Sequence, residues 1–148
     1  AGDAVTHTLE YVMPNRAAEV WPDIEPLVRR CIDEAVDGEY SAEDILRDIR
    51  RGQAFAFVEA LDGRVTCVVV FHVHTLTHVK IADAAVIAGE DLKGFSKRVW
   101  PVIKQWAAAN KIDRIEAAVS DAMYRMCKRF FGFQKTHNLI AFEVGEPA

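Results

Sequence analysis

The sequence is short of cysteine, of long hydrophobic runs and of excess basic charge. Its three cysteines, Cys31, Cys67 and Cys127, are widely spaced within apolar stretches, so we expect buried thiols in a reducing compartment and no disulfide framework. No apolar run is longer than Cys67 to Phe71, far short of the ~20 residues of a membrane-spanning helix. The 18 Lys and Arg residues against 22 Asp and Glu residues give a formal charge of −4. These features argue against a membrane or a nucleic acid as the main partner.

Motifs of several enzyme classes are also missing. The sequence has no Cys-x-x-Cys pair and no Gly-x-Ser-x-Gly elbow of a serine hydrolase. His72 and His74 form a His-x-His pair, with His78 after the next turn, and such a pair can bind zinc. No third ligand is spaced to complete a site. We therefore interpret these histidines as the polar face of an antiparallel strand and expect no metal.

Length and composition predict a single domain, residues 1–148. With 51% hydrophobic and 27% charged residues, the chain is too apolar for disorder and long enough to build its own core. The segment Ala1-Gly2-Asp3 has neither the basic nor the apolar region of a signal peptide. We expect a soluble protein of the cytoplasm.

Hydrophobic periodicity and turn signals predict elements in the order β-α-α-β-β-β-α-β-α-β-β. The expected strands are Val5–Val12, Ala54–Leu61, Val65–His74, Val79–Ala88, Ile115–Val119, Phe133–Thr136 and Leu139–Val144. The expected helices are Ile24–Ala35, Ser41–Gly52, Phe95–Asn110 and Asp121–Gly132.

Individual residues set the boundaries of these elements. Asp23 is the expected N-cap of the first helix, Ser41–Asp44 resembles a capping box for the second, and Asp121 is the expected cap of the last. Asp62-Gly63 is a two-residue hairpin signal. Pro101 either delays the start of the third helix or kinks it.

The fold class that follows is α/β with a mixed sheet. Strand Val79–Ala88, the helix that contains Trp106 and strand Ile115–Val119 form a β-α-β unit. Its two strands should be parallel neighbours with a right-handed crossover. The strands before this unit form an antiparallel meander.

This order of elements, together with two local patterns, resembles the GNAT (Gcn5-related N-acetyltransferase) superfamily over nearly the whole chain. The segment Asp121–Phe133, which ends Phe130-Phe131-Gly132-Phe133, looks like the superfamily's helix that ends in Gly-Phe. The segment Gly89–Lys111 looks like its acetyl-CoA loop and helix. The resemblance implies the acyl-CoA N-acyltransferase fold and, for an enzyme, acetyl transfer from acetyl-CoA to an amine.

The superfamily holds the cofactor's diphosphate on an Arg/Gln-x-x-Gly-x-Gly/Ala turn, and the matching stretch here is Asp91–Ser96. Asp91 stands where a cation or an amide is expected, and Glu90 adjoins it. Two carboxylates repel a diphosphate, so we expect a degraded acetyl-CoA site and no resident cofactor. If acetyl-CoA does bind, the resemblance assigns these residues to it: Lys93, Gly94, Phe95 and Ser96.

Three residues are candidates for catalysis if the protein is an enzyme. Asp83 lies on an otherwise apolar strand face, where a desolvated carboxylate suits a general base; a structural Asp is the alternative. The superfamily's frequent general acid is a Tyr four residues before the Gly of the Gly-Phe pair, and Lys128 occupies that position. Tyr124, one helical turn earlier on the same side, is its possible substitute. Glu116 is the second candidate for the base.

These departures from the superfamily pattern point to a narrower resemblance. Short-tailed bacteriophages carry small GNAT-like proteins, the internal virion protein A type, in which the acetyl-CoA motif is similarly degraded. The sequence therefore favours a non-catalytic structural or interaction protein of the virion. The alternative is an acetyl-CoA-dependent N-acetyltransferase with an atypical diphosphate turn.

Under the first function, the expected partner is another protein. The predicted terminal strand Leu139–Val144 would leave a sheet edge open for strand addition, with Phe142 as an anchor. A proline in place of Ala141 would then block association, because it removes an edge N–H.

Overall fold

Five strands form one mixed sheet in the computed structural model, which describes residues 6–35, 40–136 and 144–145. They lie across the sheet in sequence order: β1 (His7–Tyr11), β2 (Ala54–Leu61), β3 (Arg64–Thr75), β4 (Lys80–Gly89) and β5 (Arg114–Glu116). Neighbouring strands are antiparallel except β4 and β5, which are parallel. The predicted α/β class, with its mixed sheet and its parallel pair, is confirmed.

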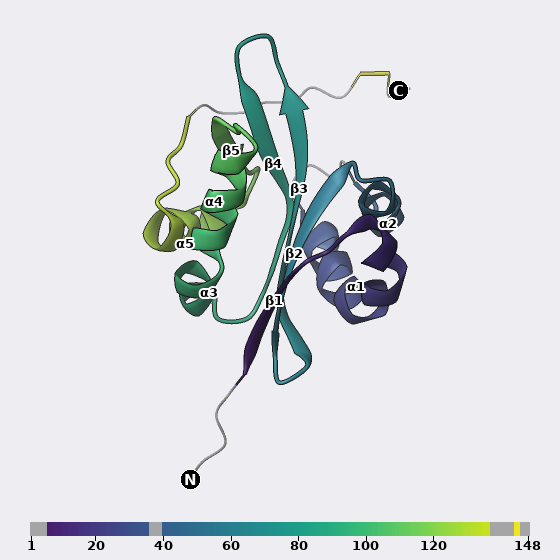
Figure 1. Ribbon diagram of the computed structural model, residues 1–148. Helices are drawn as coiled ribbons and strands as arrows, with labels where there is room; N and C mark the ends of the chain where they lie inside the picture. The colour runs from purple at the N-terminus through teal and green to yellow at the C-terminus, as the bar shows by residue number, and fades with distance from the viewer. Residues whose placement is uncertain (1–5, 36–39, 137–143, 146–148) are drawn as a thin grey trace.

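Helices cover both faces of this sheet, as Figure 1 shows. On one face lie α1 (Ala17–Asp33) and α2 (Ala42–Arg50), and a short 3-10 helix, η1 (Pro14–Arg16), leads from β1 into α1. On the other face lie α3 (Leu92–Arg98), α4 (Trp100–Ala109) and α5 (Asp121–Phe131). The sheet therefore separates two hydrophobic cores.

The central strand β3 explains why the middle of the chain is so apolar. Val68 and Val70 face the core beneath α1 and α2, whereas Val69 and Phe71 face the core beneath α3 and α4. A strand that is covered on both faces requires apolar side chains at successive positions. Each such side chain contributes about 1.5–3 kcal/mol by its burial, so the same strand stabilises both helical layers.

Two local turn signals are confirmed. Asp62 and Gly63 both have positive φ, 50° and 84°, as the tightest hairpin turns between strands require. Ser41 Oγ accepts a hydrogen bond from the Asp44 N–H at 3.1 Å, and Asp44 Oδ2 accepts one from the Ser41 N–H at 3.1 Å. This reciprocal pair is the predicted capping box of α2.

The first helix begins earlier than predicted. It starts at Ala17, so Asp23 lies inside the helix and does not cap it. Trp21 is buried and extends the apolar stripe by a turn toward the N-terminus. Pro22 and Pro26 both lie within the helix and are exposed, so burial of the stripe outweighs the two missing N–H donors.

Two boundaries in the second half also differ from prediction. The helix around Pro101 is divided into α3 and α4 at Val99, which places the proline in the first turn of α4, where a missing N–H costs little. Ser120, and not Asp121, caps α5, because Ser120 Oγ accepts a hydrogen bond from the Met123 N–H at 3.2 Å.

The predicted strands after α5 are not observed in the described residues. Phe133–Thr136 forms no strand, and the Phe133 ring instead packs against Trp100 and Phe131, with centroids 5.6 and 6.3 Å away. Leu139–Val144, apart from its last residue, lies outside the described residues, and so do its proposed anchor and proline site. Within the described ranges, every helix is too short or too polar to cross a membrane.

Candidate functional site

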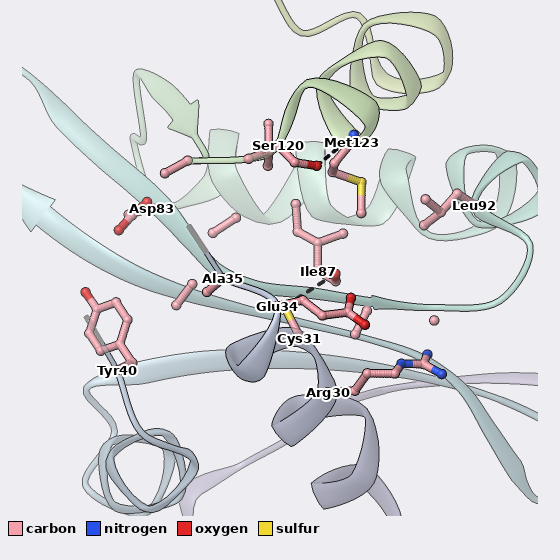
Figure 2. A pocket seen from close by; sticks show the side chains of 16 residues that line it. Arg30, Cys31, Glu34, Ala35, Tyr40, Asp83, Ile87, Leu92, Ser120 and Met123 are labelled. Atoms are coloured by element: carbon pink, nitrogen blue, oxygen red, sulfur yellow. Dashed lines mark hydrogen bonds between the residues drawn. The ribbon is translucent and has the colours of Figure 1, made fainter. Parts of the chain in front are cut away.

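A cavity opens where the two parallel strands stop pairing. Asp83–Glu116 is the last register pair of β4 and β5, so β5 ends before the predicted Val119, which lines the cavity instead. The cavity measures about 440 Å³ and is lined by β4, by the segment that leads into α5 and by the C-terminal end of α1 (Figure 2). The carboxyl ends of parallel strands are the usual place for a ligand site in an α/β sheet.

A bulge and small side chains shape the β4 wall of this cavity. The register of β3 with β4 shifts between Val70 and Phe71, so that Ala85 is an extra residue on β4. A bulge leaves its residue outside the ladder and re-aims the neighbouring groups. The small residues on the wall are Ala84, Ala85, Ala88 and Gly89. A ligand in the cavity can therefore approach the β4 backbone closely.

The two ends of the cavity differ in chemistry. Figure 2 shows Asp83 and Tyr40 at one end, which we call the Asp83 end, and Leu92 and Arg30 at the other, which we call the Leu92 end. The Asp83 end presents a carboxylate and a phenol. The Leu92 end presents an apolar side chain and a guanidinium, and it adjoins the turn from β4 into α3.

A buried acid–histidine pair lies behind the Asp83 end. His72 on β3 is the register partner of Asp83, and its Nε2 lies 3.0 Å from Asp48 Oδ2 on α2. The Tyr40 ring stacks on the imidazole, with centroids 4.7 Å apart. His72 is 8% exposed, and its Nδ1 has no hydrogen-bond partner among the described residues. The interpretation of His72 as solvated is therefore wrong, because α2 covers this part of β3, whereas His74 is exposed as expected.

At the Leu92 end, the side chain of Asp91 accepts a hydrogen bond from within the turn into α3. Asp91 has a left-handed backbone with φ 50°, and its Oδ1 accepts a hydrogen bond from the Gly94 N–H at 3.1 Å. Its carbonyl accepts a second from the Phe95 N–H at 3.0 Å. The Asp91 and Arg98 side chains also cover Gly94 so closely that a Cβ there would collide with both. Two N–H groups in the first turn of α3, those of Gly94 and Phe95, are thus occupied within the chain.

The predicted cofactor contacts lie on this turn, but two of their side chains have other roles. Phe95 is 1% exposed and belongs to the core beneath α3. Ser96 Oγ donates to the Lys93 carbonyl at 2.6 Å, and the Lys93 side chain is exposed. None of these residues is among those that line the cavity in the described part of the chain.

A buried ion pair fixes α3 against the sheet. Glu59 on β2 is 2% exposed, and it accepts hydrogen bonds from Arg98 Nε at 2.7 Å and from Arg98 Nη2 at 3.0 Å. Thr66 Oγ1 donates to the same carboxylate at 3.2 Å. The arginine holds the pKa of Glu59 below its ordinary value. Arg98 also lies 3.7 Å from Asp91, so it links the turn into α3 to the core.

The helix α5 brings other residues to the cavity than those predicted from the sequence. Ser120 and Met123 line it, whereas Tyr124 and Lys128 are not among the described residues that line the cavity. The Lys135 ammonium lies 5.0 Å from the centre of the Tyr124 ring, and Lys128 is exposed. No sequence pattern singled out Ser120.

Glu116 and Cys31 also have definite places. Glu116 Oε1 accepts a hydrogen bond from Arg114 Nε at 2.8 Å, and this carboxylate is not on the described cavity wall. Cys31 lines the cavity, and its Sγ lies 3.7 Å from the Ile87 carbonyl. Burial raises the pKa of the Cys31 thiol, which keeps it protonated and unsuited to act as a nucleophile.

Among the described residues, no three His, Cys, Asp or Glu side chains gather as a metal site.

The shape of the chain is shared with acetyltransferases of known structure. An aminoglycoside acetyltransferase from an uncultured soil metagenomic sample, in complex with sisomicin, superposes with a TM-score of 0.71 at 9% identity, over 94% of this chain and 97% of that one. A predicted acetyltransferase with acetyl-CoA from Clostridium acetobutylicum gives 0.69 at 10%, over 94% and 97%. Aminoglycoside N-acetyltransferase AAC(6')-Iy in complex with CoA gives 0.66 at 10%, over 97% of both chains.

Sequence comparison gives no relative. Neither a protein-family model nor a curated protein sequence matches the chain. None of the three structures is a virion protein, so the narrower resemblance to phage proteins rests on the sequence alone. The mixed sheet, its parallel β4–β5 pair and the superpositions agree on the architecture. The chain has the GNAT acyl-CoA N-acyltransferase fold.

Proposed function

We propose that the protein transfers an acetyl group from acetyl-CoA to an amine in the cavity between β4 and the segment that follows β5. The observation that carries this proposal is the cavity itself, which opens where the parallel strands β4 and β5 stop pairing and has a carboxylate, Asp83, at one end. The structures that superpose on the chain include acetyltransferases with acetyl-CoA and with CoA, which supports the same donor here.

The cavity has the shape and the lining for the acyl part of acetyl-CoA. The small side chains of β4 leave its backbone accessible, and the Leu92 side chain forms an apolar wall at the other end of the cavity. When bound, acetyl-CoA supplies a thioester-activated acetyl group. The turn into α3 fits a diphosphate less well, because the Gly94 N–H is taken by Asp91.

The chain's own residues have distinct tasks in this reaction. Asp83 accepts the proton that the acceptor ammonium must lose before its nitrogen becomes nucleophilic. Backbone N–H groups near the Ala85 bulge, beyond the last β5 pair, are placed to stabilise negative charge on an acyl oxygen. The Ser120 hydroxyl lines the cavity and acts as the proton donor, the role for which the sequence suggested Tyr124 or Lys128.

A turnover assay with acetyl-CoA and a panel of primary amines tests this proposal. Asp83→Asn should lower the rate by about 10²–10⁴-fold, because it removes a general base, while the affinity for CoA stays unchanged. Glu116→Gln is the matched control on the neighbouring strand and should retain the wild-type rate. If no amine is acetylated, or if Asp83→Asn keeps the full rate, the proposal fails.

A second candidate is the non-catalytic role, favoured by one observation. The carboxylate of Asp91 accepts the Gly94 N–H in the first turn of α3, and Glu90 precedes it, so the turn has an internal anion where a diphosphate would lie. Under this candidate, the protein acts through contacts with another protein, as a virion component would. Asp83→Asn, Tyr124→Phe and Lys128→Ala should then all leave the biological activity intact in a host or virion assembly assay.

A further inference from the structure

Arg30 is the one cation among the described residues that line the cavity. It projects from the C-terminal part of α1 toward the Leu92 end, as Figure 2 shows. The pKa of Glu90 is lowered mainly by the hydrogen bond and charge of Arg64 and, to a smaller extent, by the charge of Arg30, so Arg30 lies within electrostatic reach of the turn between β4 and α3. Among the described residues, its side chain makes neither an ion pair nor a hydrogen bond with another side chain.

The other arginines near this turn are already engaged. Arg98 is held by Glu59 and Asp91. Arg64 Nη1 and Nη2 donate to the two Glu90 oxygens at 2.9 and 3.2 Å. An anion that enters the cavity would therefore find the turn's carboxylates already paired with these arginines, and Arg30 available opposite them.

We propose that Arg30 binds the diphosphate of the acyl donor, in place of the cation or amide that Asp91 displaces from the turn. This inference rests on the proposed function, since it names a ligand for the same donor. A guanidinium presents two parallel N–H donors that match phosphate oxygens. The diphosphate would thus be held from α1, across the cavity from α3.

The charge of Glu34 opposes this role and provides a second test. Glu34 is the C-cap residue of α1, four residues after Arg30, and also lines the cavity, nearer its middle in Figure 2. A carboxylate at that distance weakens the attraction for a phosphate. Glu34→Gln should therefore raise the affinity for CoA, whereas Arg30→Ala should lower it.

Calorimetric titration separates the part of the donor that carries the diphosphate and the nucleotide from its pantetheine part. The probes are CoA and pantetheine, because pantetheine lacks the diphosphate and the nucleotide. Arg30→Ala should weaken CoA binding by about 10–100-fold, the size of a lost charge-assisted hydrogen-bond pair, and leave pantetheine binding unchanged. Arg30→Lys should recover part of the loss.

The neighbouring arginine is the matched control. Arg29 is bound to Glu25 at 2.9 Å and to Glu43 at 2.6 Å, so Arg29→Ala changes the net charge equally without touching the cavity. Equal CoA affinity of wild type, Arg29→Ala and Arg30→Ala overturns this inference alone. A larger loss in Lys93→Ala than in Arg30→Ala also overturns it, because the diphosphate would then lie on α3. If the wild type binds neither CoA nor pantetheine, the proposed function fails as well.

Discussion

The two ends of the cavity place their charged side chains differently. At the Asp83 end, the acid–histidine pair of Asp48 and His72 lies behind the cavity wall, and Asp83 itself lines the cavity. At the Leu92 end, the charges of the turn are neutralised within the chain, Asp91 by the α3 N-terminus and by Arg98. Under the proposed function, the Asp83 end serves proton transfer, and the Leu92 end has to obtain its anion-binding charge from outside the turn.

The Asp83 end has space, backbone access and a carboxylate on the cavity wall. The turn at the Leu92 end carries an internal cap, where the resemblance to the superfamily implies a diphosphate site. Variants that change one end and leave the other intact test whether the two ends act separately.

The largest effect is expected where the Leu92 end joins the core. Arg98→Met leaves the 2%-exposed Glu59 carboxylate without its partner, and an uncompensated buried charge costs about 3 kcal/mol or more. The double variant Glu59→Gln, Arg98→Met should recover much of this loss, because it removes both charges. Urea unfolding measures the free energies; Arg64→Met, whose pair with Glu90 is exposed, is the control and should change little.

The same ion pair predicts a pH dependence. The pKa of Glu59 is lower in the folded state than its ordinary value of 4.5. Its stabilising contribution is therefore fully present above that value and is lost as the pH falls through the lower folded pKa. Between pH 7 and pH 3, the wild type should lose more stability than the double variant. An equal loss in both proteins would show that the pair does not stabilise the fold.

A smaller effect is expected behind the Asp83 end. His72→Phe removes one of the two side-chain partners of the Asp48 carboxylate, the other being Arg47, whose Nε donates to Asp48 Oδ1 at 3.1 Å. Asp48 is only 12% exposed as a side chain, so the loss should cost about 1–3 kcal/mol. The affinity for CoA should not change, because the donor's diphosphate lies at the far end. His74→Phe, on the exposed part of the same strand, is the control. A loss of CoA affinity in His72→Phe would contradict the division of the cavity into two ends.

The smallest change in stability is expected at the internal cap. Asn caps a helix about as well as Asp, so Asp91→Asn should alter the free energy of unfolding by less than about 0.5 kcal/mol. It removes one negative charge from the turn, which should raise the affinity for CoA by about 5-fold. Ser41→Asn, the equivalent cap exchange in α2, should leave CoA affinity unchanged. Unaltered CoA binding in Asp91→Asn would show that the carboxylate does not oppose the diphosphate.

The sequence predicted those features of the fold that depend on neighbouring residues. Asp62-Gly63 required a tight turn, and Ser41 with Asp44 formed the expected capping box. The change from strand to helix period around Trp106 correctly predicted the parallel β4–β5 pair. The start of α1 was predicted wrongly, because the burial of Trp21 depends on tertiary contacts that outweigh a local proline signal.

The cavity was harder to predict, because its residues come from distant segments. Arg30, Tyr40, Asp83 and Ser120 meet only through the sheet and its covering helices, and no local pattern joins them. Asp83 was found because a lone carboxylate interrupts an apolar strand. The repulsion between Asp91 and a diphosphate stays a prediction. The role of Asp91 as the cap of α3 depends on a left-handed backbone that the sequence pattern did not indicate.

Thermal unfolding with and without acetyl-CoA tests the central claim most directly. A donor at 100 times its dissociation constant stabilises the fold by about 2.7 kcal/mol, which corresponds to a rise of about 5–10 °C in Tm for a domain of this size. We predict this rise for the wild type and for Asp83→Asn alike, since Asp83 acts on the acceptor. No rise in either protein at millimolar acetyl-CoA would contradict the account and favour the non-catalytic role.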